Sequence, residues 1–240
     1  MRTSGLILFI ALFAISGLSW EYAGAADQTS KTLAILPFEN NSITDPGRFE
    51  PLTKGLSAML ITDLNNSQNI LRVIERNKIQ ALLKEIALSQ SGSVDQSTAI
   101  QAGKILGAQS IAFGSFMVMG EMVRIDTRII KVETGELIMA ESITGDTQGF
   151  LNLEKKLAKK IAVSLGALRK ESVSSDSDNG VSGSKSESKQ KGLNPALLYS
   201  MGLDAMDRGD KEEARRLFKE CISLDPTFKN WVDDVKGLEL

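Results

Sequence analysis

The sequence contains no histidine and a single cysteine, Cys221. The absence of histidine removes the commonest general base, the usual partner of a nucleophilic serine or cysteine, and the commonest zinc ligand. With one cysteine the chain can form no internal disulfide and can assemble no Cys/His metal cluster. We therefore expect no metal and no cofactor, and we expect Cys221 to be a small buried apolar residue.

An excess of either charge is also missing, because 28 basic and 30 acidic residues give a formal net charge of -2. This balance provides no electrostatic attraction to nucleic acid. Aspartate and glutamate are plentiful, but none lies in a motif with catalytic spacing. Gly103-Lys104 resembles the end of a phosphate-binding loop, yet Thr98 and Ile105 occupy positions that require a glycine and a hydroxyl residue. We predict that the protein is not an enzyme, unless folding brings a carboxylate pair together.

Residues 1–25 have the features of a secretory signal peptide. Arg2 is followed by an apolar run at residues 6–18 and by the small residues Ala23-Gly24-Ala25. The apolar run is shorter than the ~20 residues that a transmembrane helix requires. We expect cleavage after Ala25 or Ala26, and no direct lipid anchor, because no cysteine stands directly after the cleavage site. The expected location is the periplasm, with the protein soluble or peripheral to the outer membrane.

Composition changes sharply after residue 170. The next segment consists mainly of serine, glycine and charged residues, with only two valines to bury. As a random coil it would span roughly 25 Å, so the parts on either side are expected to be tethered without a fixed relative orientation. The predicted organisation is a signal peptide at 1–25, an α/β domain at 31–170, a disordered linker at 171–192 and a small helical unit at 193–240.

The part before the linker alternates strand-like and helix-like patterns. Apolar runs at residues 32–36 and 71–74 predict two strands of a covered sheet. Leucines at every fourth position over residues 52–64 predict a helix, and a second amphipathic helix is predicted at 79–86. A third helix is expected to end at Gly107, since glycine suits a left-handed C-cap.

From residue 110 the hydrophobic period changes to alternation. Strands are predicted at residues 111–119 and 122–132, joined by Gly120-Glu121 in a type II′ turn, and a third at 137–143. A final helix has one apolar face, and the opposite face is expected to be solvated and to carry Glu154, Lys155, Lys156, Lys159 and Lys160. This order of elements predicts an α/β fold with helices packed on a mixed sheet.

Four segments of this part form a moderately specific set: LAILPFEN at 33–40, VIERNKIQALLKE at 73–85, SIAFGSF at 110–116 and IIKVETGEL at 129–137. The set resembles the periplasmic domain of the curli secretion-channel family, CsgG. That resemblance implies the CsgG-like fold. Members of the family are outer-membrane lipoproteins that form oligomeric secretion pores, and relatives of the fold are periplasmic accessory proteins of envelope assembly. This chain lacks the lipid-bearing cysteine and the long membrane hairpins. For Glu75 and Arg76 we expect structural roles at the start of a helix.

Beyond the linker, large and small residues follow the spacing of one tetratricopeptide (TPR) repeat. In this pattern Gly202 and Ala205 allow two helices to approach, and Phe218 fills the gap between them. A single repeat cannot bury its apolar faces alone, so we expect a capping helix and docking onto another chain or onto the α/β domain. The residues predicted to contribute to partner binding are Leu198, Met201, Gly202, Ala205, Phe218 and Trp231.

These observations predict a non-enzymatic, exported accessory or scaffold protein for an envelope or secretion system. Its partners are expected to be envelope or secretion-system proteins, and a homo-oligomer is left open. The alternative is an oligomeric outer-membrane pore subunit of the curli-channel type.

Overall fold

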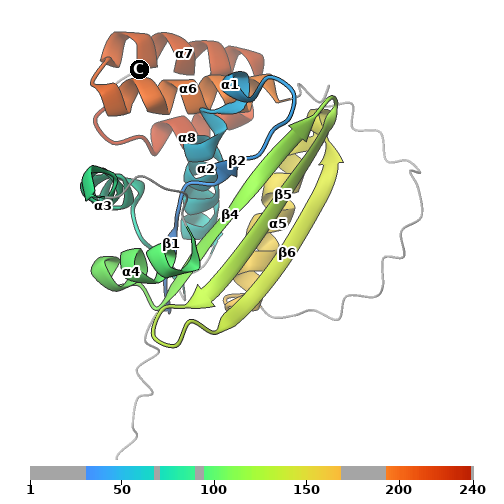
Figure 1. Cartoon of the computed structure of the whole chain (residues 1–240). Coiled ribbons are helices and arrows are strands. Elements are labelled where there is room, and N and C mark those ends of the chain that lie inside the picture. Colours follow the sequence, from blue (N-terminus) through green and yellow to red (C-terminus); the bar gives the residue numbers. More distant parts are fainter. Residues whose placement is uncertain (1–30, 68–70, 90–94, 169–192, 239–240) are drawn as a thin grey trace, which may run out of the picture.

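The computed structural model describes residues 31–67, 71–89, 95–168 and 193–238 (Figure 1). The expected signal peptide at 1–25 and the expected linker at 171–192 lie outside these ranges. The described chain contains a six-stranded mixed sheet with helices packed on it, followed by a group of C-terminal helices. The predicted fold class is therefore confirmed.

The sheet has the strand order β3-β1-β4-β5-β6, with a short strand β2 paired to β4. Strand β1 (Lys31–Ile35) runs parallel to β3 (Leu71–Val73) and to β4 (Ser110–Met119). Strands β4, β5 (Met122–Lys131) and β6 (Leu137–Asp146) form an antiparallel meander, while β2 (Glu39–Asn40) is parallel to β4. Parallel and antiparallel pairs thus occur in one sheet, as the alternating sequence pattern predicts.

The β4–β5 hairpin has the two-residue connection predicted from Gly120-Glu121. Met119 pairs with Met122, and Gly120 has a φ of 60°. A positive φ at the first central residue is what a type II′ turn requires, and glycine adopts it without steric cost. Both hairpin strands are ten residues long, and both belong to the central sheet.

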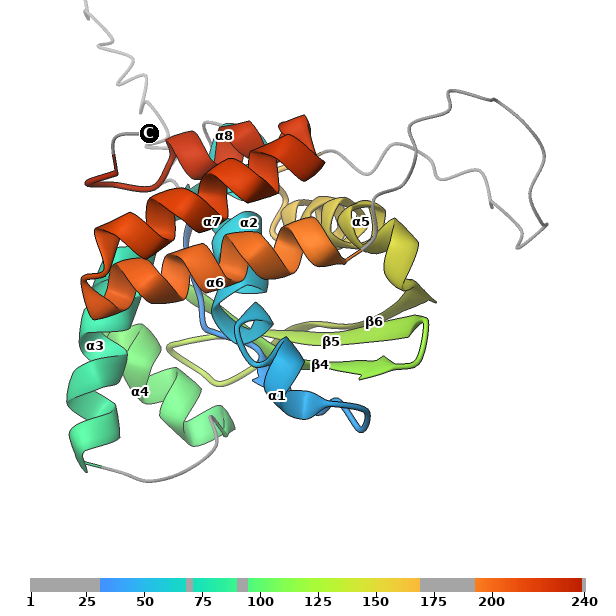
Figure 2. The same ribbon diagram turned by 90° about the horizontal axis from the view of Figure 1, so that it is seen from above.

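Helices cover both faces of the sheet. Helices α2 (Leu52–Ser67) and α5 (Phe150–Ser164) lie side by side on one face, and α4 (Gln96–Leu106) packs against β4 from the other face (Figure 1, Figure 2). Gly107 ends α4 with a φ of 66°, as predicted. The remaining elements of this part are α1 (Pro46–Phe49), α3 (Arg76–Ser89) and a 3-10 turn (Thr147–Gly149).

The C-terminal part is a helical hairpin followed by a short third helix. Helices α6 (Asn194–Arg208) and α7 (Lys211–Leu224) pack against each other, and a 3-10 turn (Pro226–Phe228) leads into α8 (Lys229–Asp233). A Cβ atom on Gly202 would lie 2.6 Å from the ring of Phe218, so glycine is required at this helix crossing. Cys221 is buried, as expected.

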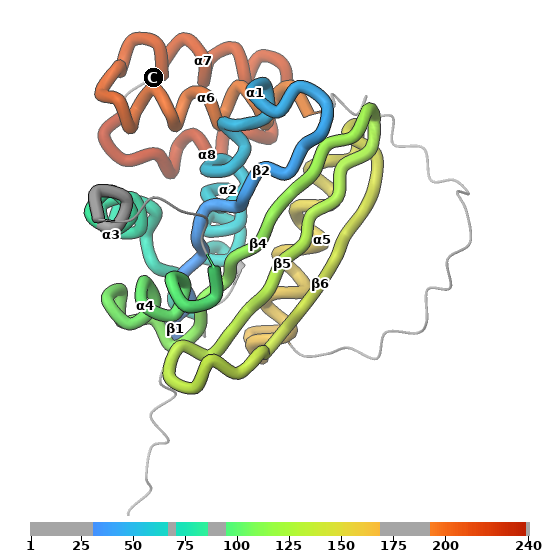
Figure 3. Tube along the Cα trace, in the orientation of Figure 1, coloured from blue at the N-terminus to red at the C-terminus, as the bar shows by residue number. Residues whose placement is uncertain are grey.

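The C-terminal helices are docked on the α/β part, which is one of the two docking partners expected for a single repeat and differs from the expectation of two parts without a fixed orientation. Helix α6 packs along α2, and the trace shows the C-terminal helices stacked over α2 (Figure 2, Figure 3). The close approach depends on Gly55, because a Cβ atom there would lie 1.7 Å from Oγ of Ser200. Ser200 is itself fully buried.

One residue of the final helix of the α/β part, α5, lies on the face opposite to the predicted one. Glu154 was expected on the solvated face beside the lysines, but its exposed fraction is 0%. The prediction was wrong because residue 154 precedes Ala158 by four positions and Ile161 by seven, which places all three on one face. Lys155, by contrast, is exposed as expected.

Candidate functional site

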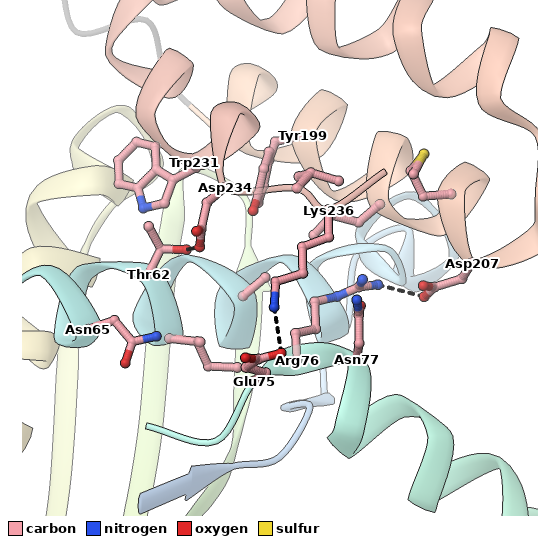
Figure 4. A pocket seen from close by; sticks show the side chains of 15 residues that line it. Thr62, Asn65, Glu75, Arg76, Asn77, Tyr199, Asp207, Trp231, Asp234 and Lys236 are labelled. Atoms are coloured by element: carbon pink, nitrogen blue, oxygen red, sulfur yellow. Dashed lines mark hydrogen bonds and ion pairs between the residues drawn. The ribbon is translucent and has the colours of Figure 1, made fainter. Parts of the chain in front are cut away.

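A cavity of about 460 Å³ lies between the α/β part and the C-terminal helices (Figure 4). Its walls come from α2, from the start of α3, from α6 and from the segment after Trp231. It therefore lies where two parts of the chain meet, which is a common location for binding sites. Figure 4 shows the polar side chains that face it.

Two basic residues of the α/β part bind two acidic residues of α6. Nη2 of Arg76 is 2.6 Å from Oδ2 of Asp207, and these side chains are only 15% and 16% exposed. Lys54 contributes from α2, with its Nζ 2.5 Å from Oδ1 of Asp204 and 3.5 Å from Oδ2 of Asp207. Burial opposes ionisation of Asp204, but the hydrogen bond from Lys54 and the charges of Lys54 and Arg208 outweigh it, so its pKa is lowered.

Further polar contacts tie the end of the chain to the α/β part. Oε2 of Glu75 is 2.7 Å from Nζ of Lys236, and this hydrogen bond and charge lower the pKa of Glu75. The hydroxyl of Thr62 donates to Asp234 at 2.7 Å. Glu75 and Arg76 therefore do more than begin a helix, because each also binds a residue more than 100 positions away.

An aromatic cluster borders the cavity from the C-terminal side. The rings of Tyr199 and Phe218 are 5.9 Å apart between centroids, those of Tyr199 and Phe228 are 6.0 Å apart, and those of Phe228 and Trp231 are 4.9 Å apart. The side chain of Tyr199 is almost fully buried, and burial raises its pKa. Its hydroxyl points toward the cavity (Figure 4).

Trp231 connects α8 to α2 and α5, the two helices that lie side by side on one face of the sheet. Its indole Nε1 donates to Oδ1 of Asp63 on α2 at 2.8 Å. Nζ of Lys155 on α5 lies 6.0 Å from the centroid of the indole ring, within reach of a cation–π contact. Trp231 is 3% exposed, so the junction of α2, α5 and α8 excludes water around the indole.

The carboxyl group of Asp63 also interacts with that of Glu154 on α5. Burial raises the pKa of Glu154 well above its ordinary value, and the charge of Asp63 and a hydrogen bond to it act in the same direction. Burial also raises the pKa of Asp63, although the hydrogen bonds from Trp231 and Glu154 oppose the shift. A buried carboxyl beside a second carboxyl favours its neutral form.

A carboxylate pair is the arrangement that would favour an enzyme, but this pair does not surround a substrate site. Asp63 borders a cavity of about 420 Å³, whereas Glu154 is not part of its lining and has no exposed surface. General acid–base catalysis requires both groups within hydrogen-bonding reach of a substrate. Among the described residues, no group of three His, Cys, Asp or Glu side chains is placed to hold a metal ion.

The six residues predicted to contribute to partner binding separate into two groups. Gly202, Ala205 and Phe218 are buried between α6 and α7, and Trp231 is buried against α2 and α5. Leu198 is partly buried, and Met201 is 41% exposed. Among the six predicted residues, only Leu198 and Met201 therefore present side-chain surface to solvent.

Sequence reasoning identified Trp231 as a binding residue but missed the other residues that dock the two parts. Gly55 carried a signal, since glycine inside a helix costs about 1 kcal/mol relative to alanine and so indicates a packing role. The pairing of Lys54 and Arg76 with acidic residues of α6 gave no comparable signal. No helix in the described ranges is long and apolar enough to cross a membrane.

Comparisons with known proteins give one family match and several structural likenesses. The LpoB C-terminal domain from Salmonella enterica has 18% identity and a TM-score of 0.36, covering 49% of this chain and 83% of that one. TolB from Acinetobacter baumannii has 15% identity and a TM-score of 0.39, covering 58% of this chain and 29% of that one. The PelC dodecamer from Paraburkholderia phytofirmans has 14% identity and a TM-score of 0.35, covering 58% and 90%.

No curated protein matches the chain significantly. The family model described as curli production assembly/transport component CsgG matches residues 23–122. In the described part of the chain this range extends from β1 to the first residue of β5. Over residues 23–122 the chain is therefore similar to the CsgG family, and three of the four sequence segments, at 33–40, 73–85 and 110–116, lie within this range.

Proposed function

We propose that the protein is a non-enzymatic, exported periplasmic accessory or scaffold protein for the assembly of an envelope or secretion system. The observation that carries the proposal is the match of the CsgG family over residues 23–122. The similar solved structures, which include LpoB, TolB and PelC, do not add support to the proposal, because their sequence identity to this chain is low. We assign partner binding to the α/β domain and to the C-terminal helices. We interpret these helices as one TPR-like unit.

The outer side of α6 is the surface that we assign to a partner on the helical unit. Leu198 and Met201 are three positions apart, so they lie on the same side of the helix. The opposite side of α6 is already used, because it packs against α2 and α7. A partner that approaches α6 from solvent therefore meets these two apolar side chains.

Site-specific photo-crosslinking in cells tests this assignment. A crosslinking amino acid at Met201 is expected to capture an envelope protein from the periplasmic fraction, and the mature chain is expected to begin at Ala26 or Asp27 by intact-mass measurement. The matched control position is Glu212 on α7, whose side chain is 87% exposed. Identical products from both positions, or none from Met201, would contradict the assignment.

The alternative of a pore subunit is tested separately. Strands β4 and β5 are both paired within the central sheet and are joined by two residues. They therefore offer no additional length for insertion while the domain stays folded. We expect no channel conductance from the purified mature protein in planar bilayers, and reproducible single-channel currents would favour the alternative.

A further inference from the structure

We propose that the carboxyl pair of Asp63 and Glu154, to which Trp231 donates a hydrogen bond through Asp63, is a proton-binding site that controls docking of the C-terminal helices. The ligand is a proton, and the two states are a docked and an undocked helical unit. This inference does not depend on the identity of the partner protein. It rests on where the two carboxyl groups lie and on what covers them.

The first step of the argument is the isolation of Glu154. Its exposed fraction is 0%, and neither of its carboxyl oxygens receives a hydrogen bond from a donor among the described residues. An ionised carboxylate buried in this way is costly, because its lost hydration is not replaced. A protonated Glu154 removes that cost and can donate its hydrogen to the carboxylate of Asp63.

The second step is the position of Asp63 between the two parts of the molecule. Its Oδ1 accepts from Nε1 of Trp231 at 2.8 Å, so the same carboxyl group joins the pair to α8. Trp231 also lies against Lys155, which places the indole over the junction of α2 and α5. When α8 leaves, Asp63 loses the hydrogen bond from Trp231 and the part of its burial that the indole provides, so solvation of the pair increases and the cost of ionising it falls.

The third step is the set of charged and titratable groups around the pair. Lys155 on α5 is the cation that favours ionisation of both carboxyls. Lys159 borders the same cavity as Asp63, together with the uncharged Asn66 and Asn230. On the C-terminal side the nearby groups are Asp234, bound to Thr62, and the buried Tyr199. Both lysines are exposed to solvent, which screens their charges, so burial dominates.

The sign of the pH dependence follows from these contacts. The pKa of Glu154 is raised in the docked state, so the docked state binds more protons than the undocked state above the ordinary pKa of 4.5. The contribution of Glu154 to docking is therefore fully present below that value and is lost as pH rises through the raised pKa. The lowered pKa values of Glu75 and Asp204 act oppositely, because their ion pairs are lost only in stronger acid.

Hydrogen exchange of the full chain measures docking directly. We expect the amides of α8 to open more often as pH rises from about 5 to about 8, after correction for intrinsic exchange, by up to tenfold per pH unit within the titration. In Glu154→Gln the side-chain amide donates to Asp63 at every pH, so protection of α8 should be high and independent of pH. The control Glu121→Gln changes an exposed turn residue and should behave as the unmodified chain.

A second variant covers the case in which Glu154→Gln does not fold. In Asp63→Asn the amide can donate to an ionised Glu154 while its oxygen accepts from Trp231, so the pH dependence should shrink. Protection of α8 that is equal at both ends of the pH range in the unmodified chain would overturn the proposal. An undiminished pH dependence in both variants would also overturn it.

Discussion

Gly55 sets how closely the two parts of the molecule approach. It lies in the interior of α2, where alanine would be the better helix former by about 1 kcal/mol. Ser200 of α6 occupies the space that a side chain would need, with its Cβ 2.6 Å and its Cα 3.2 Å from the position of an added Cβ. The glycine is therefore explained by contact with a residue far along the sequence.

Replacing Gly55 with alanine is expected to destabilise the protein by about 1 to 3 kcal/mol, because overpacking outweighs the gain in helix propensity. Denaturant unfolding measures the change. The matched control is Gly47→Ala, since no atom lies within 4 Å of its added Cβ, and it should be nearly neutral. Adding Ser200→Gly to Gly55→Ala should recover part of the loss. A Gly55→Ala variant as stable as the unmodified chain would show that α6 does not pack here.

At the scale of the elements, the contact of α6 with α2 and α3 depends on a partly buried ion network. Arg76 and Asp207 are each about 85% buried, and Lys54 contacts the same aspartate. Removal of Asp207 leaves the mostly buried charge of Arg76 without this ion-pair partner, whereas removal of Arg76 leaves Asp207 with Lys54 alone. The network therefore fixes which face of α6 meets α2.

A double-mutant cycle with Arg76→Ala and Asp207→Ala should give a coupling free energy of about 1 to 2 kcal/mol, as for residues that share one network. The comparison pair is Arg216 and Glu213 on α7, whose side chains are 61% and 36% exposed. Its coupling should be much smaller than that of the interface pair, because solvent screens exposed pairs. Equal coupling in the two cycles would mean that the interface ion pair does not contribute to docking.

Local pattern was sufficient to predict most elements of the fold. The leucine spacing of α2, the alternation in β5 and the glycines at positions 107 and 120 each depend on near neighbours in the chain. Docking of α6 and the burial of Glu154 depend on residues far apart in sequence, which periodicity does not reveal. Glu154 was predicted to be exposed because acidic residues are usually solvated. Its helical spacing from Ala158 and Ile161 instead places it on the buried face, and the structure agrees with the spacing.

At the scale of the whole molecule, the chain combines a CsgG-like sheet domain with helices that cover α2. The contacts between them join residues more than 100 positions apart: Lys54 to Asp204, Thr62 to Asp234, Asp63 to Trp231, Glu75 to Lys236 and Arg76 to Asp207. Met201 remains exposed while the helices are docked. The surface that we propose for a partner is therefore accessible in the docked arrangement.

Cutting the full chain at a protease site inserted between residues 180 and 181 tests the docked arrangement most directly. After cleavage, the account predicts that the C-terminal fragment elutes together with the α/β fragment in size-exclusion chromatography near pH 5. The same experiment on Gly55→Ala should show partial separation. A C-terminal fragment that elutes alone from the unmodified sequence at this pH would contradict the docked arrangement on which the account depends.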